Sequence, residues 1–205
     1  VSGQEEGFPA GIRISGKSNV LVTSCGVPAT PGGACPNPEG RVQQFGYGVL
    51  MTSGTIHSTV EKLRILRNAM SGVELFDADD GRNGNTVRNN TINDNELGIT
   101  LLAGTTNATI VGNDIYGSLG EAAVIEFSDG NLLQDNNMVG IPSNPNLDSD
   151  GGVLIRGAAD NTITGGEIRD TGDAGVVIDL GSSDNTVEDV VMYRNGDAGV
   201  IVNDS

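Results

Sequence analysis

Hydrophobic and polar residues alternate in short runs that recur along the chain. A small residue opens each unit, at Gly11, Gly48, Gly72, Gly98, Ala122, Gly152, Gly175 and Gly199. Successive openings are 37, 24, 26, 24, 30, 23 and 24 residues apart, which indicates a unit of 23 to 24 residues with three insertions. An alternation with a period of two is typical of strands, and no run keeps the spacing of a helix. The pattern therefore predicts an all-β repeat protein.

Three apolar columns repeat in every unit, and they predict three short strands per unit. The first column begins with Val49 and Met51, the second with Val60 and the third with Ile65. The opening glycines suit a tight corner with positive φ. Asparagines stand before the second strand and between the second and third strands, where stacked amides can form hydrogen-bonded ladders. These asparagines are Asn19, Asn85, Asn131, Asn161 and Asn185 in one column, and Asn90, Asn113 and Asn136 in the other.

Three strands per unit and a bend after each predict a parallel β-helix, whose coils stack about 4.8 Å apart. The segments GNTVRNNTINDNELGITL, NATIVGNDI and DNTITGGEIRDTGDAGVVI carry the pattern best. They resemble the right-handed parallel β-helix repeats of the pectate-lyase-like superfamily, and the resemblance covers residues 11–205. It implies a right-handed solenoid of about seven coils. The superfamily includes polysaccharide lyases, glycoside hydrolases, epimerases, tailspikes, adhesins and accessory proteins of copper enzymes, so the fold alone does not define the activity.

The domain organisation follows from the repeat and its insertions. We expect one β-helix domain over residues 1–205, with insertions at 25–45, 77–84 and 140–150. The chain stops one strand into a further coil, which favours a fragment of a longer β-helix, or ends covered by further coils or another chain. The first and third insertions leave the coil at the same corner. We therefore expect them to rise as two walls beside the sheet of first strands.

Two cysteines lie in the first insertion. A disulfide between Cys25 and Cys35 would close a short loop and stabilise the fold by roughly 2 to 4 kcal/mol. It would also place the protein in an oxidising compartment, extracellular or at the cell surface. The alternative is two free thiols in a cytosolic protein.

The charge balance excludes several partners. The chain has 11 Lys and Arg against 27 Asp and Glu, a net charge of −16. Nucleic acids and anionic membrane surfaces need a basic footprint, so neither is an expected partner. No apolar run approaches the roughly 18 residues of a membrane span. The single histidine, His57, and the four methionines do not support a copper site.

The outward face of the first strands carries an unusual apolar stripe. It consists of Leu50, Thr100, Val124, Leu154, Val177 and Ile201. An apolar surface of this kind needs a cover or a partner. Either the long insertions fold over it, or it forms the floor of a ligand groove.

A second outward column holds the candidate catalytic residues Glu126, Arg156 and Asp179 on successive coils, preceded by Phe76 and Leu102 as an apolar platform for a sugar ring. The carboxylates of Glu126 and Asp179 would lie about 9 to 10 Å apart. That separation allows an inverting hydrolysis of a polysaccharide with a water between them. Arg156 could instead act beside a uronate. The alternative is a surface ladder of ion pairs, contributing little to stability.

The acidic insertions are candidate Ca²⁺ sites. Asp77, Asp79 and Asp80 lie in one and Asp148 and Asp150 in another, and hard oxygen ligands on loops that contain glycine suit Ca²⁺. The alternative is ordinary solvated turns.

A basic cluster with Arg64 and Arg67 forms either a salt-bridged outer wall or a patch that binds uronate.

Two functions stay open. The first is a secreted β-helix that binds or modifies an extracellular polysaccharide, of which a uronate-containing polymer is one candidate, in the manner of a lyase, hydrolase or epimerase. The second is a non-catalytic structural or adhesive module of a larger cell-surface protein.

Overall fold

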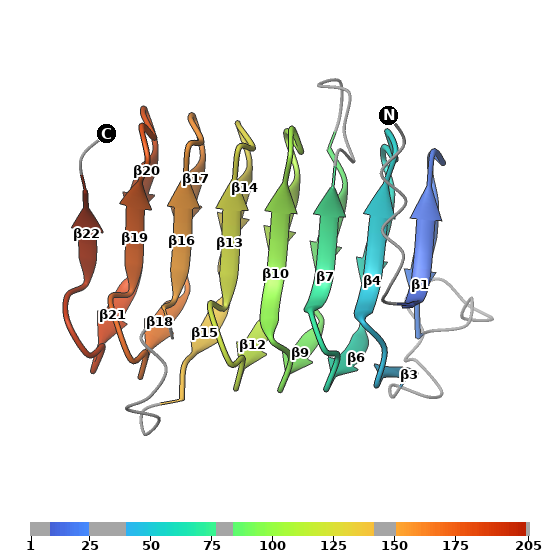
Figure 1. Ribbon diagram of the computed structural model, residues 1–205, viewed down its shortest axis with the longest axis horizontal. Coiled ribbons are helices and arrows are strands. Elements are labelled where there is room, and N and C mark those ends of the chain that lie inside the picture. Colours follow the sequence, from blue (N-terminus) through green and yellow to red (C-terminus); the bar gives the residue numbers. More distant parts are fainter. Residues whose placement is uncertain (1–8, 25–39, 77–83, 142–150, 204–205) are drawn as a thin grey trace.

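The protein is a solenoid of three parallel β-sheets (Figure 1). The structure, a computed structural model, describes residues 9–24, 40–76, 84–141 and 151–203. Each coil contributes one strand to each sheet, and all strand pairs are parallel. The all-β solenoid with three strands per coil is thus confirmed. None of the described residues forms a helix that is long and apolar enough to cross a membrane.

The strands are arranged by coil in each sheet. In the described ranges the first sheet has eight strands, β1 (Ala10–Ser15), β4 (Tyr47–Thr52), β7 (Ser71–Phe76), β10 (Leu97–Leu102), β13 (Ala123–Glu126), β16 (Val153–Arg156), β19 (Val176–Asp179) and β22 (Val200–Val202). The second has seven in the same part of the chain, β2 (Leu21–Thr23), β5 (Thr59–Glu61), β8 (Thr86–Arg88), β11 (Thr109–Val111), β14 (Leu132–Gln134), β17 (Thr162–Thr164) and β20 (Thr186–Glu188). The third, again within those ranges, has seven, β3 (Gly40–Gln43), β6 (Leu63–Leu66), β9 (Thr91–Asn93), β12 (Asp114–Tyr116), β15 (Asn137–Val139), β18 (Glu167–Arg169) and β21 (Val191–Tyr193).

The core is a stack of aliphatic side chains inside the coils. Val49 pairs in register with Val73, and Val73 with Ile99, so that each apolar column becomes a continuous line of contacts. Ile65 and Ile92 of the third sheet are fully buried against the same core. Each such side chain contributes roughly 1.5 to 3 kcal/mol relative to an exposed one. The aliphatic columns therefore supply the main stabilisation, as the sequence predicts.

The glycines that open the first strands serve a different purpose from the expected one. Gly48 and Gly98 do not have positive φ. A Cβ at Gly48 would lie 2.4 Å from the carbonyl oxygen of Gly72 and 2.4 Å from Cγ2 of Ile65. The prediction of positive φ was wrong, and glycine is required here because adjacent coils approach closely at this corner.

Buried asparagine ladders connect the coils. Asn90 Nδ2 donates to Asn113 Oδ1, and Asn113 Nδ2 donates to Asn136 Oδ1, both at 3.0 Å. The same bonds run from Asn131 through Asn161 to Asn185. Each amide both donates and accepts, so these buried polar groups have hydrogen-bond partners inside the coils. The predicted ladders are confirmed at these positions.

Two details of the ladders differ from the prediction. Asn19 lies one residue outside the ladder, because it is Val20 whose N–H bonds to Ser58 Oγ, and Ser58 whose N–H bonds to Asn85 Oδ1. Asn19 has a φ of 57° and is exposed at the adjacent corner. An unpredicted third ladder joins Asn68 Nδ2 to Asn95 Oδ1 at 2.9 Å. Its two amides were missed because they stand in only a few coils.

The first insertion is shorter than predicted. Residues 40–43 form β3, which pairs with β6 and places Val42 in the core. The strand was missed because Val42 is its only aliphatic residue. The remainder of that insertion, with Cys25 and Cys35, lies outside the described residues, and the expected disulfide stays a prediction.

Candidate functional site

The strand register of the first sheet aligns the predicted site residues in one row. Leu102 pairs with Phe76 on one side and with Glu126 on the other. Glu126 then pairs with Arg156, and Arg156 with Asp179. Five successive strands thus place these side chains on the outward face at intervals of about 4.8 Å.

Glu126, Arg156 and Asp179, the polar row, are joined by ion pairs. Arg156 Nη1 lies 3.9 Å from Glu126 Oε1, and Arg156 Nη2 lies 3.7 Å from Asp179 Oδ2. The three side chains are 30 to 43 % exposed. Ion pairs in contact with solvent contribute at most about 1 kcal/mol each. Stability alone therefore gives little reason for this row.

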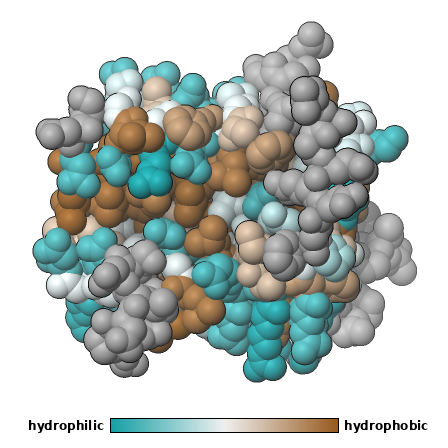
Figure 2. Space-filling model, in the orientation of Figure 1, coloured by the Kyte–Doolittle hydropathy of each residue, from teal (hydrophilic) through white to brown (hydrophobic). Residues whose placement is uncertain are grey.

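Apolar residues flank the polar row on both sides. Val124, Leu154 and Val177 lie two residues before it on the same face of their strands, and they are buried or half-buried. Phe127 and Leu180 follow it directly in sequence and are 55 and 53 % exposed. Figure 2 shows a teal row between brown ones over β13, β16 and β19. The surface is therefore polar along its centre and apolar along both borders.

The predicted apolar stripe is only partly accessible. Leu50 and Thr100 are 2 and 1 % exposed, whereas Leu154, Val177 and Ile201 are half-buried. The open part of the stripe lies over β16, β19 and β22. It therefore coincides with the end of the sheet that carries the polar row.

Sequence reasoning missed a buried carboxylate in the same sheet. Glu74 is 6 % exposed, and its Oε2 accepts hydrogen bonds from Ser71 Oγ at 3.1 Å and Thr100 Oγ1 at 3.2 Å. It is the single acidic residue in an outward column that is otherwise largely aliphatic. That exception was the signal that could have revealed it.

Phe127 and Leu180 were also missed. Each follows a charged residue directly after a strand, in the pairs Glu126–Phe127 and Asp179–Leu180. The corresponding residue after Arg156 is Gly157. An aromatic or aliphatic residue at a corner that can hold glycine is a usable signal in the sequence.

The structure does not bring Arg64 and Arg67 to the polar row. Arg64 lies on β6 of the third sheet, aligned with Thr91. Arg67 follows that strand, and its Nε lies 3.8 Å from Asp94 Oδ2 in an exposed ion pair. The predicted substrate-binding residues are therefore divided between two sheets.

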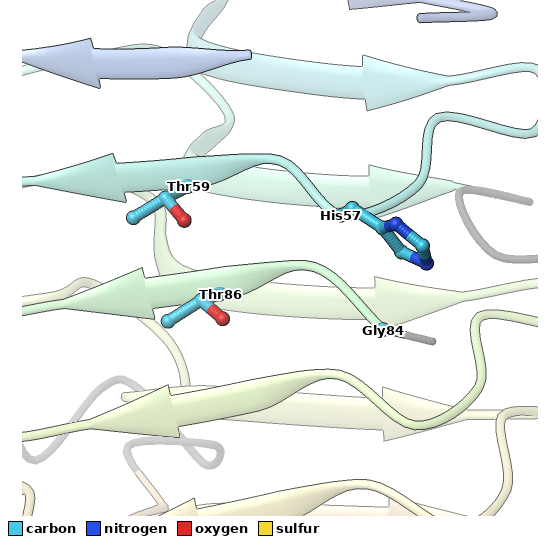
Figure 3. Close-up of a pocket in the computed structure, with 4 residues that line it drawn as sticks. All are labelled: His57, Thr59, Gly84 and Thr86. Atoms are coloured by element: carbon cyan, nitrogen blue, oxygen red, sulfur yellow. The ribbon is translucent and has the colours of Figure 1, made fainter. Parts of the chain in front are cut away.

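An open pocket of about 360 Å³ lies beside His57, and the other described residues that line it are Thr59, Gly84 and Thr86 (Figure 3). The two threonines come from adjacent strands, β5 and β8, and their side chains point the same way. The lining offers hydroxyl groups and one imidazole. Among the residues that the structure describes, this lining is polar and includes no Asp, Glu, Lys or Arg.

The third sheet holds a network of ion pairs and one tyrosine hydroxyl. Hydrogen bonds from Arg194 and Arg169 to the carboxylate lower the pKa of Asp170. Loss of hydration and a 2.9 Å hydrogen bond to Glu167 raise the pKa of Tyr193. These groups connect β18 to β21 and lie on a different sheet from the polar row.

The parallel coils and their ladders define a β-helix, and comparison with known families gives its type. The family described as "Right handed beta helix region" matches residues 97–205, more than half of the chain. The protein belongs to this family, which confirms the right-handed form. A second family, described as "Periplasmic copper-binding protein (NosD)", matches residues 40–124.

Copper does not fit the described residues of that segment. Copper prefers imidazole, thiolate and thioether ligands. His57 shares its pocket with Thr59 and Thr86, and Met51 is fully buried in the core. Within the described ranges, no group of three or more His, Cys, Asp and Glu side chains could hold a metal ion. The predicted Ca²⁺ ligands Asp77, Asp79, Asp80, Asp148 and Asp150 lie outside those ranges.

Several solved structures share the fold at low sequence identity. The mannuronan C-5 epimerase AlgE4 A-module from Azotobacter vinelandii is 13 % identical, with a TM-score of 0.57, and the match covers 78 % of this chain and 46 % of that one. Tailspike protein 2 from Escherichia coli O157:H7 bacteriophage CAB120 is 14 % identical with a TM-score of 0.55, over 79 % and 27 %. A double mutant of the periplasmic alginate epimerase AlgG is 13 % identical with a TM-score of 0.55, over 95 % and 48 %.

The chain spans less than half the length of each of these proteins. A comparison with curated protein sequences gave no match. At such identities the likeness shows the fold alone.

Proposed function

We propose that this protein binds an extracellular polysaccharide along the outward face of the first sheet, over β13, β16 and β19. The observation that carries the proposal is the exposed polar row between two apolar borders (Figure 2). A pyranose ring has an apolar C–H face and a rim of hydroxyl groups. A surface with apolar contacts and a few placed polar groups matches that amphipathic ligand.

The repeat of the fold suits a repeating ligand. Successive coils present equivalent positions about 4.8 Å apart. A polymer that lies across the strands therefore meets a new coil at each step. Several weak contacts then add along one chain, as multivalent binding requires.

The similar structures support the ligand class and the location. Two of them are epimerases of mannuronan and of alginate by name, and both are polysaccharides. The word periplasmic occurs in the name of AlgG and in the description of the second matching family. An acidic chain with few lysines is consistent with secretion.

The geometry favours binding over hydrolysis. An inverting hydrolase needs a water molecule between its two carboxylates. Here the guanidinium of Arg156 lies between Glu126 and Asp179 and forms ion pairs with both. We therefore assign the polar row to recognition of sugar hydroxyls, for which carboxylates accept and guanidinium groups donate hydrogen bonds.

A polysaccharide-binding assay tests the proposal. The wild-type chain and the variants Arg156→Ala and Arg67→Ala are compared by affinity electrophoresis in gels that contain neutral or acidic polysaccharides. Arg67 is a matched control, because it also forms an exposed ion pair but lies beside the third sheet. We expect Arg156→Ala to weaken binding about tenfold or more, which corresponds to the loss of one charged hydrogen bond.

The outcomes separate the alternatives. Weaker binding in Arg67→Ala alone would place the site on the third sheet. A wild-type chain that binds no polysaccharide would contradict the proposal and favour the structural or adhesive module.

Calcium binding is a separate proposal with its own test. Ca²⁺ bound to the acidic insertions would stabilise the folded state by mass action. A chelator should then lower the melting temperature, and an unchanged melting curve would remove the proposal.

A further inference from the structure

Phe127 and Leu180 occupy a strained corner of the coil. Their φ values are 51° and 55°, in the left-handed region that costs a residue with a side chain roughly 1 to 2 kcal/mol. The same corner has positive φ in the other coils where it is described, and there it carries the small residues Gly16, Ser53, Ala103 and Gly157. Since both side chains are more than half exposed, burial offsets little of the strain. The left-handed backbone is a regular feature of this corner, so what sets Phe127 and Leu180 apart is a large, exposed apolar side chain, which points to a ligand.

The Phe127 ring is held in a defined position. A Cβ at Gly157 would lie 2.6 Å from Cε1 and 2.8 Å from Cδ1 of Phe127. The ring therefore rests against the backbone of the next coil, which has room for it because residue 157 is glycine. The N–H of Phe127 also donates to the carbonyl of Arg156 at 3.0 Å. One side of the ring is supported, and the other side is open to solvent.

The charges beside the ring do not favour an anionic ligand. The polar row has two carboxylates and one guanidinium, a net charge of −1, and Arg156 is paired on both sides. Arg156 is also the only Lys or Arg in the described strands β7, β10, β13, β16, β19 and β22. The whole chain has a net charge of −16. A polymer of uronates or sulfated sugars would meet repulsion here.

We infer that the ligand is a neutral polysaccharide, one of whose pyranose rings stacks its C–H face on Phe127 while its hydroxyl groups bond to the polar row. The inference rests on the proposed binding function of this face and adds the ligand class and the residue that positions it. Leu180, one coil beyond Gly157, extends the apolar contact to the next sugar. Because the ring is already fixed, little side-chain entropy is lost on binding.

The test compares neutral with anionic probes. Galactomannan, a β-glucan and dextran are the neutral probes, and alginate and polygalacturonate are the anionic ones. Affinities are measured at low and high salt for the wild type, Phe127→Asn and Tyr116→Ser. Asparagine tolerates the left-handed backbone, so Phe127→Asn removes the ring while keeping or raising the melting temperature. Tyr116 is a control, because it is an exposed aromatic residue on β12 of the third sheet.

We expect at least one neutral probe to bind with little dependence on salt, and Phe127→Asn to weaken that binding at least tenfold. Tyr116→Ser should bind as the wild type does. Should Phe127→Asn fail to fold, Phe127→Gly takes its place, because glycine occupies this corner in the coil of Gly157.

Three results would overturn the inference, and they are distinguishable. Tighter, salt-sensitive binding of alginate or polygalacturonate would refute the neutral ligand and leave the proposed function intact. Neutral binding that is the same in Phe127→Asn would refute the stacking position. A wild-type chain that binds none of the five probes would refute the proposed function and the inference together.

Discussion

The asparagine ladders and the polar row stack polar side chains in the same way, one per coil, yet they differ in every other respect. The ladder around Asn113 repeats one residue type, is buried, and joins its amides at 3.0 Å. The polar row from Glu126 to Asp179 changes residue at each coil, is partly exposed, and joins its charges at 3.7 to 3.9 Å. Repetition thus marks what holds the coils together, and variation marks the face on which we propose that a ligand binds.

The difference has a chemical cause. An amide donates and accepts, so that identical amides can continue a ladder through any number of coils. A guanidinium between two carboxylates is complete after three coils. In the buried ladders, loss of one partner leaves a polar group with neither water nor a hydrogen bond. At the surface, water and salt ions compensate for a missing partner.

We expect the largest loss of stability from Asn113→Ala, in one of the buried ladders. It removes the acceptor for two N–H groups of Asn90 and the donor for the carbonyl of Val87, all buried. We expect the free energy of unfolding to fall by about 3 kcal/mol, measured by urea denaturation. Asn185→Ala, at the half-buried end of another ladder, should cost less. Equal small losses in both would show that the ladders do not hold the coils together.

Acid should remove the stabilisation that paired carboxylates contribute in the other two sheets. Burial raises the pKa of Glu61, but the hydrogen bond and charge of Arg88 outweigh it and hold the pKa below its ordinary 4.5. The pKa of Asp170 is likewise held below 3.8. The folded state binds these protons less readily than the unfolded state, so the stabilisation is complete above the ordinary values and is lost as the pH falls through the lowered ones.

Urea midpoints measured from neutral pH to below 3.8 check this expectation. In Glu61→Gln the urea midpoint should fall less on acidification than in the wild type, because the glutamine side chain does not titrate. A variant with the same acid decline as the wild type would exclude Glu61 as a contributor.

Gly157→Ala tests the corner at the border of the polar row, where the Phe127 ring lies. The added methyl would strain a backbone with φ of 56° and meet the Phe127 ring at 2.6 Å. We expect a loss of about 1 to 2 kcal/mol in stability and weaker polysaccharide binding, although no charge or ring is removed. Gly54→Ala is the control, since it has a φ of 68° but no atom within 4 Å of the added methyl. If Gly54→Ala impaired binding equally, the effect would not come from the ring.

Arg156→Gln should have the smallest effect on stability. Its two ion pairs are longer than 3.5 Å and solvent-exposed, so the change should stay within about 1 kcal/mol. Binding should fall while the melting temperature hardly moves. A loss as large as that of Asn113→Ala would identify the row as part of the scaffold.

The sequence predicted what repeats and missed what occurs once. Columns such as Val49 and Ile65 fix the strand register, and the register places Glu126 beside Arg156 without any knowledge of coordinates. Glu74 was missed because it interrupts a column rather than continuing it.

Corner conformations were equally hidden. The opening glycines were given positive φ, although they are needed for close approach, whereas positive φ recurs at the corner of Phe127, where the residue type changes from coil to coil. Its ring position depends on Gly157, thirty residues away in sequence and one coil away in space. Such pairings follow from the folded geometry, not from local pattern.

The ladder also makes one coil interchangeable with the next. Asn113 and Asn136 are 23 residues apart and offer the same donor and acceptor to their neighbours. Duplicating the segment between them would insert a rung that both sides can accept, and would lengthen the molecule by about 4.8 Å. Gain or loss of a whole coil is thus the natural route by which such a solenoid changes its length, and with it the extent of the proposed polysaccharide site, while an insertion or deletion of a single residue would shift the register of the ladder.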